Sequence, residues 1–209
     1  MNRFGLGVLC LLVCATVVAP STVAEEAPPK TKRNSIGVGV FYHSPGDPLD
    51  DGAGFDVQYT RSLARVLLRA ELSSMSLEGD QGGGDFDFLA LSVGALWAFS
   101  PNSWRVRLAV GGGIEYIDGD GGGETVVEPP PIDIRNTFEV DSGIGFHGDF
   151  EAALPLGSAW ELYGRVGYLV ATLDAERRFI ISGVPDSNPV AVDLELDGPQ
   201  LTIGAAFRF

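Results

Sequence analysis

The residues best suited to catalysis are the two histidines of the chain, His43 and His147. His43 is followed by Ser44, and carboxylates occur nearby at Asp47 and further along at Asp85. A histidine between a carboxylate and a serine hydroxyl can activate that hydroxyl for acyl transfer. This spacing has little specificity, because turn residues commonly surround a histidine that only makes structural hydrogen bonds. We therefore predict no catalytic residues and no enzyme activity.

Three glycine-rich acidic segments are candidates for binding divalent cations: Gly46–Gly52, Gly79–Asp85 and Asp118–Glu124. The last has alternating carboxylates, but it lacks the additional ligands and the spacing of an EF-hand. Solvated loops are the favoured interpretation. We predict no metal site and no cofactor. A calcium bridge from these carboxylates to phosphates outside the protein is a hypothesis that calcium titration would test.

Acidic residues also dominate the overall charge. The chain has 28 Asp and Glu against 14 Lys and Arg, a net charge of -14, which argues against nucleic acid as a partner. Its 45% hydrophobic content excludes a disordered acidic chain. The lysines occur only at Lys30 and Lys32, so every cation from Arg61 to Arg208 is an arginine. Arginine suits enclosed, two-pronged pairing with carboxylates.

The N-terminal segment has the features of a secretory signal peptide. An apolar run over Leu6–Ala19 follows a basic residue and leads to small residues, which predicts a signal peptide over residues 1–24 with cleavage after Ala24. Cys10 and Cys14 both lie inside it, and neither follows a small residue as lipid attachment requires. The mature chain is expected to fold outside the cytosol without disulfides, behind a flexible leader over residues 25–34.

The candidate residues must be positioned by β-strands, because apolar residues recur at every second position from Ser35 onward. Three connections are short and four are long, and they alternate along the chain. This alternation predicts an all-β, eight-stranded antiparallel up-and-down barrel over residues 35–209, with both termini at the turn end. At Gly198-Pro199 the apolar parity shifts, which predicts a bulge or break. The expected runs are 36–42, 55–59, 66–72, 89–99, 104–116, 138–150, 160–170 and 201–209, and the long connections are 44–53, 78–85, 118–136 and 174–197.

Two features indicate that the apolar face of the barrel is on the outside. Aromatic residues on that face cluster at both strand ends, as in the interfacial girdles of a membrane barrel. They are Trp97, Phe99, Trp104, Trp160, Phe207 and Phe209 near the turns, and Tyr42, Phe55, Tyr116, Phe138 and Tyr168 near the loops. The opposite parity alternates small residues with charges of both signs. These are Arg69, Glu71, Arg105, Arg107, Glu115, Glu139, Asp141, Asp149, Glu151, Glu161, Arg165 and Arg208.

The interior of an eight-stranded barrel is just wide enough for its own side chains. We therefore predict that the arginines and carboxylates pair to plug the lumen, and that the small residues between them make room. Selective permeation is the alternative.

Residues 35–209 resemble the small eight-stranded outer-membrane barrels of Gram-negative bacteria, of the OmpA, OmpX and opacity-protein type. The resemblance rests on the signal peptide, the turn and loop alternation, and Leu201–Phe209, which is similar to the C-terminal signal recognised by barrel-assembly machinery. Unlike full-length OmpA-type proteins, the chain is expected to have no peptidoglycan-binding domain. The resemblance implies a monomer in the bacterial outer membrane. Its partners would be outer-membrane lipids, lipopolysaccharide and, through the strand ending at Phe209, the assembly machinery.

The expected function is structural or interactive: envelope integrity, adhesion, or ligand binding by the acidic extracellular loops, which carry most of the net charge. A channel for small hydrophobic solutes is the main alternative, and it requires a lateral opening. A lipid A-modifying enzyme is less favoured, because the chain has no His-x-Ser pair of the deacylase kind. A secreted, soluble lipocalin-like barrel is the last alternative.

Overall fold

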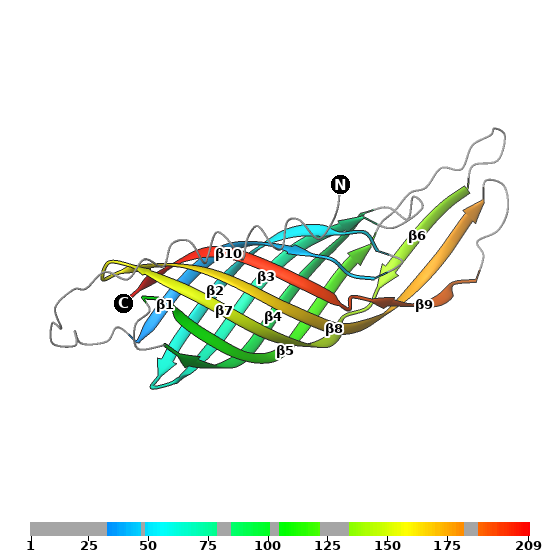
Figure 1. Ribbon diagram of the computed structural model, residues 1–209. Helices are drawn as coiled ribbons and strands as arrows, with labels where there is room; N and C mark the ends of the chain where they lie inside the picture. Colours follow the sequence, from blue (N-terminus) through cyan, green and yellow to red (C-terminus); the bar gives the residue numbers. More distant parts are fainter. Residues whose placement is uncertain (1–32, 47–48, 79–84, 101–104, 122–133, 182–187) are drawn as a thin grey trace, which may run out of the picture.

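The computed structural model describes residues 33–46, 49–78, 85–100, 105–121, 134–181 and 188–209. They form one antiparallel sheet that closes into an eight-stranded barrel (Figure 1). The strands are β1 (Asn34–His43), β2 (Gly52–Leu63), β3 (Val66–Glu78), β4 (Asp85–Phe99), β5 (Arg107–Gly121), β6 (Ile134–Val140), β7 (Gly143–Leu156), β8 (Trp160–Ile181), β9 (Val190–Glu195) and β10 (Gly198–Arg208). The predicted signal peptide and most of the leader lie outside the described residues. In the described parts of the chain, no helix is long and apolar enough to cross a membrane.

Eight wall strands arise from ten segments because two of the wall strands are interrupted. β6 and β7 both pair with β8, and so do β9 and β10 on its other side. β1 closes the barrel by pairing with β10, from Ser35 opposite Arg208 to His43 opposite Gln200. The predicted up-and-down barrel is therefore confirmed. The predicted break is also confirmed, since β9 ends at Glu195 and β10 begins at Gly198.

Two long connections contain more strand than the sequence indicated. β8 runs for 22 residues to Ile181 and pairs there with β6, and β9 pairs with β8 over Thr172–Arg177. β5 continues to Gly121 opposite Phe86. The expected loops at 118–136 and 174–197 are therefore too long, because backbone pairing extends the ladder past the point where apolar alternation stops.

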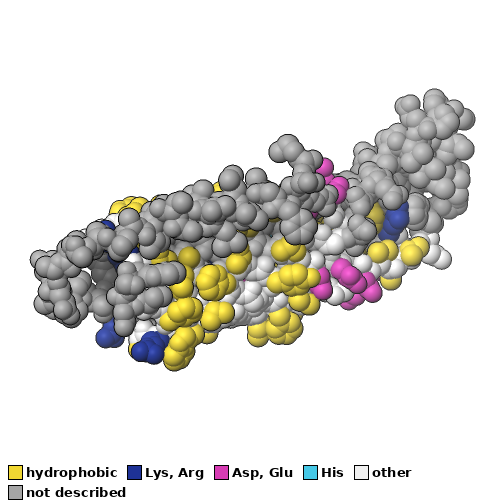
Figure 2. All heavy atoms as spheres, viewed as in Figure 1, with side chains coloured by type: hydrophobic (Ala, Val, Ile, Leu, Met, Phe, Trp, Pro, Cys, Tyr) yellow, Lys and Arg dark blue, Asp and Glu magenta, His cyan; other side chains and the backbone are white. Residues whose placement is uncertain are grey.

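The outer face of the wall is apolar, as predicted. Large hydrophobic side chains along every wall strand are exposed, for example Val40 at 66% and Phe55 at 61%. Figure 2 shows hydrophobic side chains gathered on one face of the barrel. Exposed Trp97 and Tyr116 belong to the turn-end and loop-end girdles. Of the expected girdle residues, Phe138 instead packs on Phe86 with ring centroids 5.3 Å apart, and Trp104 lies outside the described residues. Exposed hydrophobic side chains along every wall strand suit contact with the hydrocarbon of a bilayer.

The interior divides into two parts of different chemistry. The part from the middle of the barrel to the turn end, called here the charged half, contains Asp56, Arg69, Glu71, Arg107, Glu115, His147, Asp149, Glu151, Glu161, Arg165 and Arg208. The part toward the loop end, the apolar half, is a single cluster of buried hydrophobic residues. It contains Phe41, Leu49, Met75, Leu77, Phe86, Phe88, Ala90, Ile117, Leu169, Ala171, Leu173, Ala175, Leu194 and Leu196. This apolar half was not predicted from the sequence.

Candidate functional site

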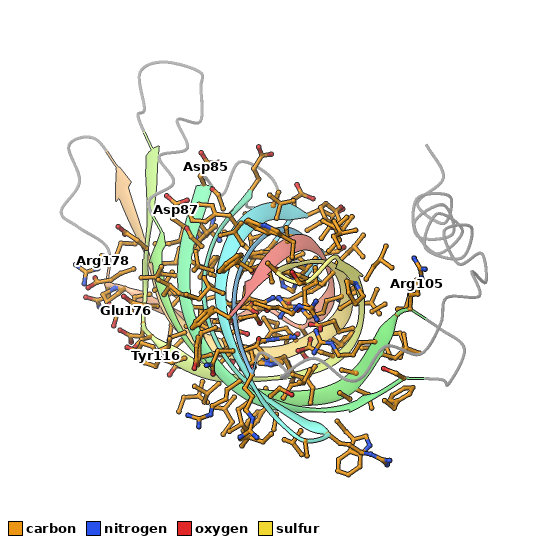
Figure 3. All side chains as sticks on the ribbon, turned by 90° about the vertical axis from the view of Figure 1, so that its left-hand side faces the viewer. Asp85, Asp87, Arg105, Tyr116, Glu176 and Arg178 are labelled. Atoms are coloured by element: carbon orange, nitrogen blue, oxygen red, sulfur yellow. The ribbon has the colours of Figure 1, made fainter. Side chains whose placement is uncertain are left out.

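The charged half is the candidate site, because it brings ionisable side chains from six wall strands together in the enclosed interior. Strand alternation directs these side chains inward while their apolar neighbours face outward. Figure 3 looks into the barrel from the turn end and shows side-chain nitrogen and oxygen atoms in its centre. The chemistry of the site depends on how these charges pair.

Arg69 and Arg107 form one group of ion pairs around Glu151. The Arg69 guanidinium donates to Glu151, 82 residues away in the sequence, and its Nη1 lies 3.9 Å from Asp149 Oδ2. Nη2 of Arg107 donates to Glu151 Oε1 at 3.2 Å and to Glu161 Oε1 at 3.1 Å. Both side chains of the Arg69–Glu151 pair are less than 5% exposed. The pairs therefore link β3, β5, β7 and β8 across the lumen.

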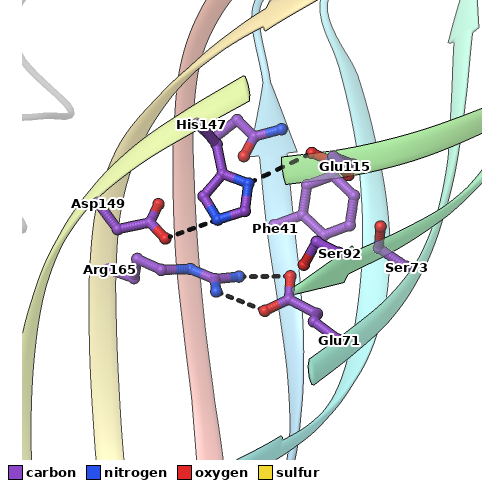
Figure 4. Close-up of a pocket in the computed structure, with 9 residues that line it drawn as sticks. Phe41, Glu71, Ser73, Ser92, Glu115, His147, Asp149 and Arg165 are labelled. Carbon is purple, nitrogen blue, oxygen red and sulfur yellow. Dashed lines mark hydrogen bonds and ion pairs between the residues drawn. The ribbon is translucent and has the colours of Figure 1, made fainter. Parts of the chain in front are cut away.

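Arg165 forms the second group. Its Nη1 and Nη2 donate to the two carboxylate oxygens of Glu71 at 2.5 and 2.8 Å, the two-pronged geometry expected for arginine (Figure 4). Nε and Nη2 also donate to Thr202 Oγ1 at 3.4 and 3.3 Å. Asp56 Oδ2 lies 3.9 Å from Nη2, and Asp56 Oδ1 accepts a hydrogen bond from the Tyr163 hydroxyl at 3.2 Å. The predicted pairing of arginines with carboxylates inside the barrel is therefore confirmed.

His147 lies between two carboxylates at the border with the apolar half. Its Nδ1 is 3.8 Å from Glu115 Oε2, and its Nε2 is 3.5 Å from Asp149 Oδ2 (Figure 4). Beside it is a cavity of about 10 Å³ that Phe41 also lines. That space holds about one water molecule. Side chains therefore fill the middle of the lumen.

Glycines on the inward parity make room for the larger side chains, as the sequence predicted. A Cβ at Gly39 would lie 2.8 Å from the Tyr163 hydroxyl and 2.6 Å from Asp56 Oδ2. A Cβ at Gly113 would lie 2.9 Å from the His147 ring. These separations are too short for a real side chain. The polar side chains inside the barrel therefore occupy space that is free only because glycine stands at these neighbouring positions.

Three charged residues predicted to face the lumen do not. Arg105 is exposed before β5 begins and points away from the barrel centre (Figure 3). The Glu139 side chain is 72% exposed and accepts a hydrogen bond from Arg178, while Asp141 is exposed at the break between β6 and β7. The prediction applied the inward and outward alternation beyond the ends of the strands. Outside a strand, or across a break between two strands, alternation does not fix the direction of a side chain.

The residues considered for acyl transfer do not form a catalytic set. His43 is fully buried and its Nε2 donates to the backbone oxygen of Leu196 at 3.1 Å. The Ser44 hydroxyl donates instead to Asp51, which also accepts a hydrogen bond from Tyr42. Asp85 is exposed at the start of β4 (Figure 3), and Asp47 lies outside the described residues. The contact between histidine and serine that activation of a hydroxyl requires is not formed.

The acidic segments are described in part, and three of their carboxylates, Asp85, Asp118 and Asp120, lie in strands. Asp118 and Asp120 are exposed residues of β5, and Asp120 is the direct cross-strand partner of Asp87. In the described part of the chain, no group of three or more His, Cys, Asp or Glu residues is arranged to hold a metal ion. The loop end therefore carries surface carboxylates without a formed metal site among these residues.

Several interior residues were not predicted from the sequence. Asp56 alternates with outward Phe55 and Val57, so its parity was a usable signal. Tyr163 was harder to place, because a tyrosine is equally typical of the outer girdle. For the apolar half, the available signal was a stretch in which both parities are apolar. Residues 88–91 are such a stretch, since their inward and outward side chains are all hydrophobic.

Comparison with known proteins supports the fold. No family model matches the chain, and no curated protein matches it. The outer membrane protein OprG from Pseudomonas aeruginosa has a similar structure, with a TM-score of 0.65 and 14% identity over 86% of this chain and 97% of that one. A major outer membrane protein from Thermus thermophilus has a TM-score of 0.53 and 16% identity over 84% and 99% of the two chains.

Outer Membrane Protein W from E. coli is a third similar structure, with a TM-score of 0.50 and 14% identity over 87% of this chain and 100% of that one. At these identities the comparisons show the fold. The chain has the architecture of small outer-membrane β-barrels. Its assignment to the OmpA and OmpX type remains a prediction.

Proposed function

We propose that the protein is a closed β-barrel of the bacterial outer membrane, with a structural role or a role in surface interaction. The filled middle of the barrel is the observation that carries this proposal. Ion pairs occupy the charged half, hydrophobic side chains occupy the apolar half, and the cavity at their border is only about 10 Å³. Hydrated ions and polar solutes need a continuous wet path, and this packing opposes one.

In this proposal the two surfaces of the barrel have separate roles. The apolar exterior anchors the barrel among outer-membrane lipids, and β10 carries the signal for the assembly machinery up to Phe209. The exposed carboxylates at the loop end, among them Asp85, Asp87 and Asp120, face lipopolysaccharide or an extracellular partner. The proposal includes no catalysis, since His43 and Ser44 have separate partners. An altered lipid A mass spectrum in a host carrying His43→Ala would contradict that part.

Conductance tests the closed barrel directly. The mature chain, reconstituted in planar bilayers, should give conductance near background, and Arg107→Leu should stay near background while unfolding at a lower temperature. Large, stable conductance from the wild-type chain would contradict the proposal. Heat-modifiable migration of the protein from outer-membrane fractions tests location and barrel formation independently.

The second candidate, a conduit for small hydrophobic solutes, is favoured by a seam in the wall. Among the described residues, Asp118–Gly121 of β5 have ladder partners on β4 only, because the pairing of β5 with β7 stops at Ile117 and β6 pairs with β8. Val140 fills the seam: a Cβ added at Gly119 would lie 2.9 Å from Val140 Cγ1. Behind it is the apolar half, whose surface would accept an apolar solute once side chains move.

A disulfide across this seam separates the two candidates. The mature chain has no cysteine of its own, and we choose Gly119→Cys with Val140→Cys because a Cβ at Gly119 would lie 2.9 Å from Val140 Cγ1. If the seam admits solutes, oxidation should reduce the association of N-phenyl-1-naphthylamine with proteoliposomes, and reduction should restore it. For a closed barrel, the oxidised and reduced proteins should behave alike.

A further inference from the structure

The turn end of the barrel contains a cavity that the closed-barrel function does not use. It has a volume of about 560 Å³ and opens at the mouth of the lumen. Four arginines line it, from four separate places in the sequence: Arg33 before β1, Arg65 in the turn between β2 and β3, Arg107 in β5 and Arg208 in β10. Among the described residues, Glu161 is the single acidic residue in the lining. Basic side chains from distant parts of the sequence therefore line one open cavity at the mouth of the lumen.

These arginines fall into two pairs with different surroundings. Arg107 and Arg208 form the base and share Glu161, with Arg107 Nη2 at 3.1 Å and Arg208 Nε at 4.0 Å from its carboxylate oxygens. Arg33 and Arg65 are exposed at the rim, and neither is ion-paired with another described residue. The described lining thus has four positive charges against one negative charge. A bound anion would meet arginine guanidinium groups both at the rim and at the base of the cavity.

Deeper in the lumen the balance of charge reverses. Beyond the cavity the interior arginines of the described chain are Arg69 and Arg165, while the carboxylates there are Asp56, Glu71, Glu115, Asp149 and Glu151. An anion drawn to the mouth would be repelled from the middle of the barrel. The cavity is therefore suited to hold an anion at the turn end and unsuited to pass it through the wall.

We propose that this turn-end cavity is a binding site for a phosphate-bearing anion. Arginine matches the geometry of phosphate oxygens, and its charge persists at every physiological pH. Thr60 and Ser62, which also line the cavity, add hydroxyl donors. The volume suits a group larger than inorganic phosphate. A soluble phosphate ester and the headgroup of a phospholipid in the adjacent leaflet share this chemistry.

The experiment compares two variants that remove the same charge at the same end of the barrel. Arg33→Gln with Arg65→Gln alters the rim of the cavity, while Arg61→Gln with Arg105→Gln alters exposed arginines outside its lining. The rim variant should fold, because Arg33 and Arg65 accept their hydrogen bonds from Ser62 and Ala98 through backbone oxygens. Heat-modifiable migration checks this for both variants.

Inorganic pyrophosphate is titrated into the mature chain in phosphatidylcholine nanodiscs, and arginine side-chain NMR signals are followed. We expect saturable shifts in the wild type. The affinity of the rim variant should be lower by about tenfold or more, because it loses two arginines that can make charge-assisted contacts. The control variant should bind like the wild type. Equal loss of affinity in the two variants would overturn the proposal.

Nanodiscs containing phosphatidylglycerol distinguish the two sources of phosphate. If the ligand is a lipid headgroup, these discs should shift the same arginine signals without pyrophosphate and weaken its binding. If the ligand is soluble, the signals should respond to pyrophosphate alone. A wild-type chain that responds to neither probe would overturn the proposal. This titration does not depend on whether the lumen conducts. If conductance measurements contradicted the proposed closed barrel, the titration would still test the anion site.

Discussion

The two halves of the barrel interior are filled by side chains of different chemistry. In the charged half, Arg165 and Glu71 meet from opposite sides of the lumen with two hydrogen bonds, and Arg69 reaches across to Glu151. In the apolar half, Leu173 and Leu196 are fully buried among other hydrophobic side chains. The comparison shows that filling a narrow barrel does not require one kind of residue.

The energetic consequences of the two solutions differ. A buried ion pair contributes little relative to a well-packed apolar pair, but the loss of one partner leaves an uncompensated charge. A buried leucine contributes through its contacts, and its removal leaves a cavity. The charged half should therefore tolerate paired replacement, whereas the apolar half should tolerate only changes that keep its volume.

The largest effect is expected from Arg165→Leu. Glu71 would be left without its partner, which should lower the free energy of unfolding by about 3 to 5 kcal/mol. Urea unfolding in lipid vesicles, followed by tryptophan fluorescence, measures the change. The matched double variant, Arg165→Leu with Glu71→Leu, should recover most of the lost free energy of unfolding. If the double variant is as unstable as the single one, the charged half is not an arrangement of pairs.

A smaller loss is expected from Leu173→Ala in the apolar half, about 3 kcal/mol, because a fully buried side chain leaves a cavity. Leu91→Ala is the control: Leu91 is 54% exposed on the outer face, where lipid can fill the space. The same unfolding assay should show a clearly smaller loss for Leu91. Equal losses would mean that the apolar half is not packed as a core.

Gly39→Ala tests how tightly the charged half is packed. The added methyl group would meet the Tyr163 hydroxyl and Asp56, which should cost about 2 kcal/mol. Combining it with Tyr163→Phe removes the hydroxyl and should restore part of the stability. Thermal unfolding of the single and double variants provides the comparison. No gain from the second substitution would place the strain elsewhere.

The smallest effect is expected at the loop end, outside the interior. Asp87 and Asp120 are direct cross-strand partners of like charge, so Asp120→Asn should raise stability by about 0.2 to 1 kcal/mol at low ionic strength. Salt should reduce this gain because it screens the repulsion. Asp50→Asn, the same chemical change at another exposed position, should give no comparable gain. A gain that persists in high salt would point to a cause other than repulsion.

Much of the wall could be predicted because period-two alternation is a local signal. The outward residues of β1, such as Ile36 and Val38, and the parity shift at Gly198 are visible in the sequence. The partners across the lumen could not be predicted: Arg69 and Glu151 are 82 residues apart, and their contact depends on strand register and barrel closure. Arg105 was misplaced because alternation does not indicate where a strand begins.

The apolar half was missed for a related reason. Once the apolar parity had been assigned to the outer face, inward hydrophobic residues such as Phe86 and Leu77 could be recognised only from their shared position near the loop end. Leu49 is a stronger case, since it lies in a predicted loop and yet is 4% exposed inside the cluster. The alternation of apolar residues along a strand cannot predict the burial of a residue that lies in a loop.

The pairing of β1 with β10 has a consequence for how the molecule is made. Ser35 pairs with Arg208, so the contact that completes the wall joins residues that are far apart in the sequence. Until β10 arrives, β1 and the growing sheet each present an open edge, and pairing at such long sequence separation is slow. Closure of the wall therefore requires two open strand edges to remain available until they meet, and shielding those edges from other chains should raise the yield of folded barrel.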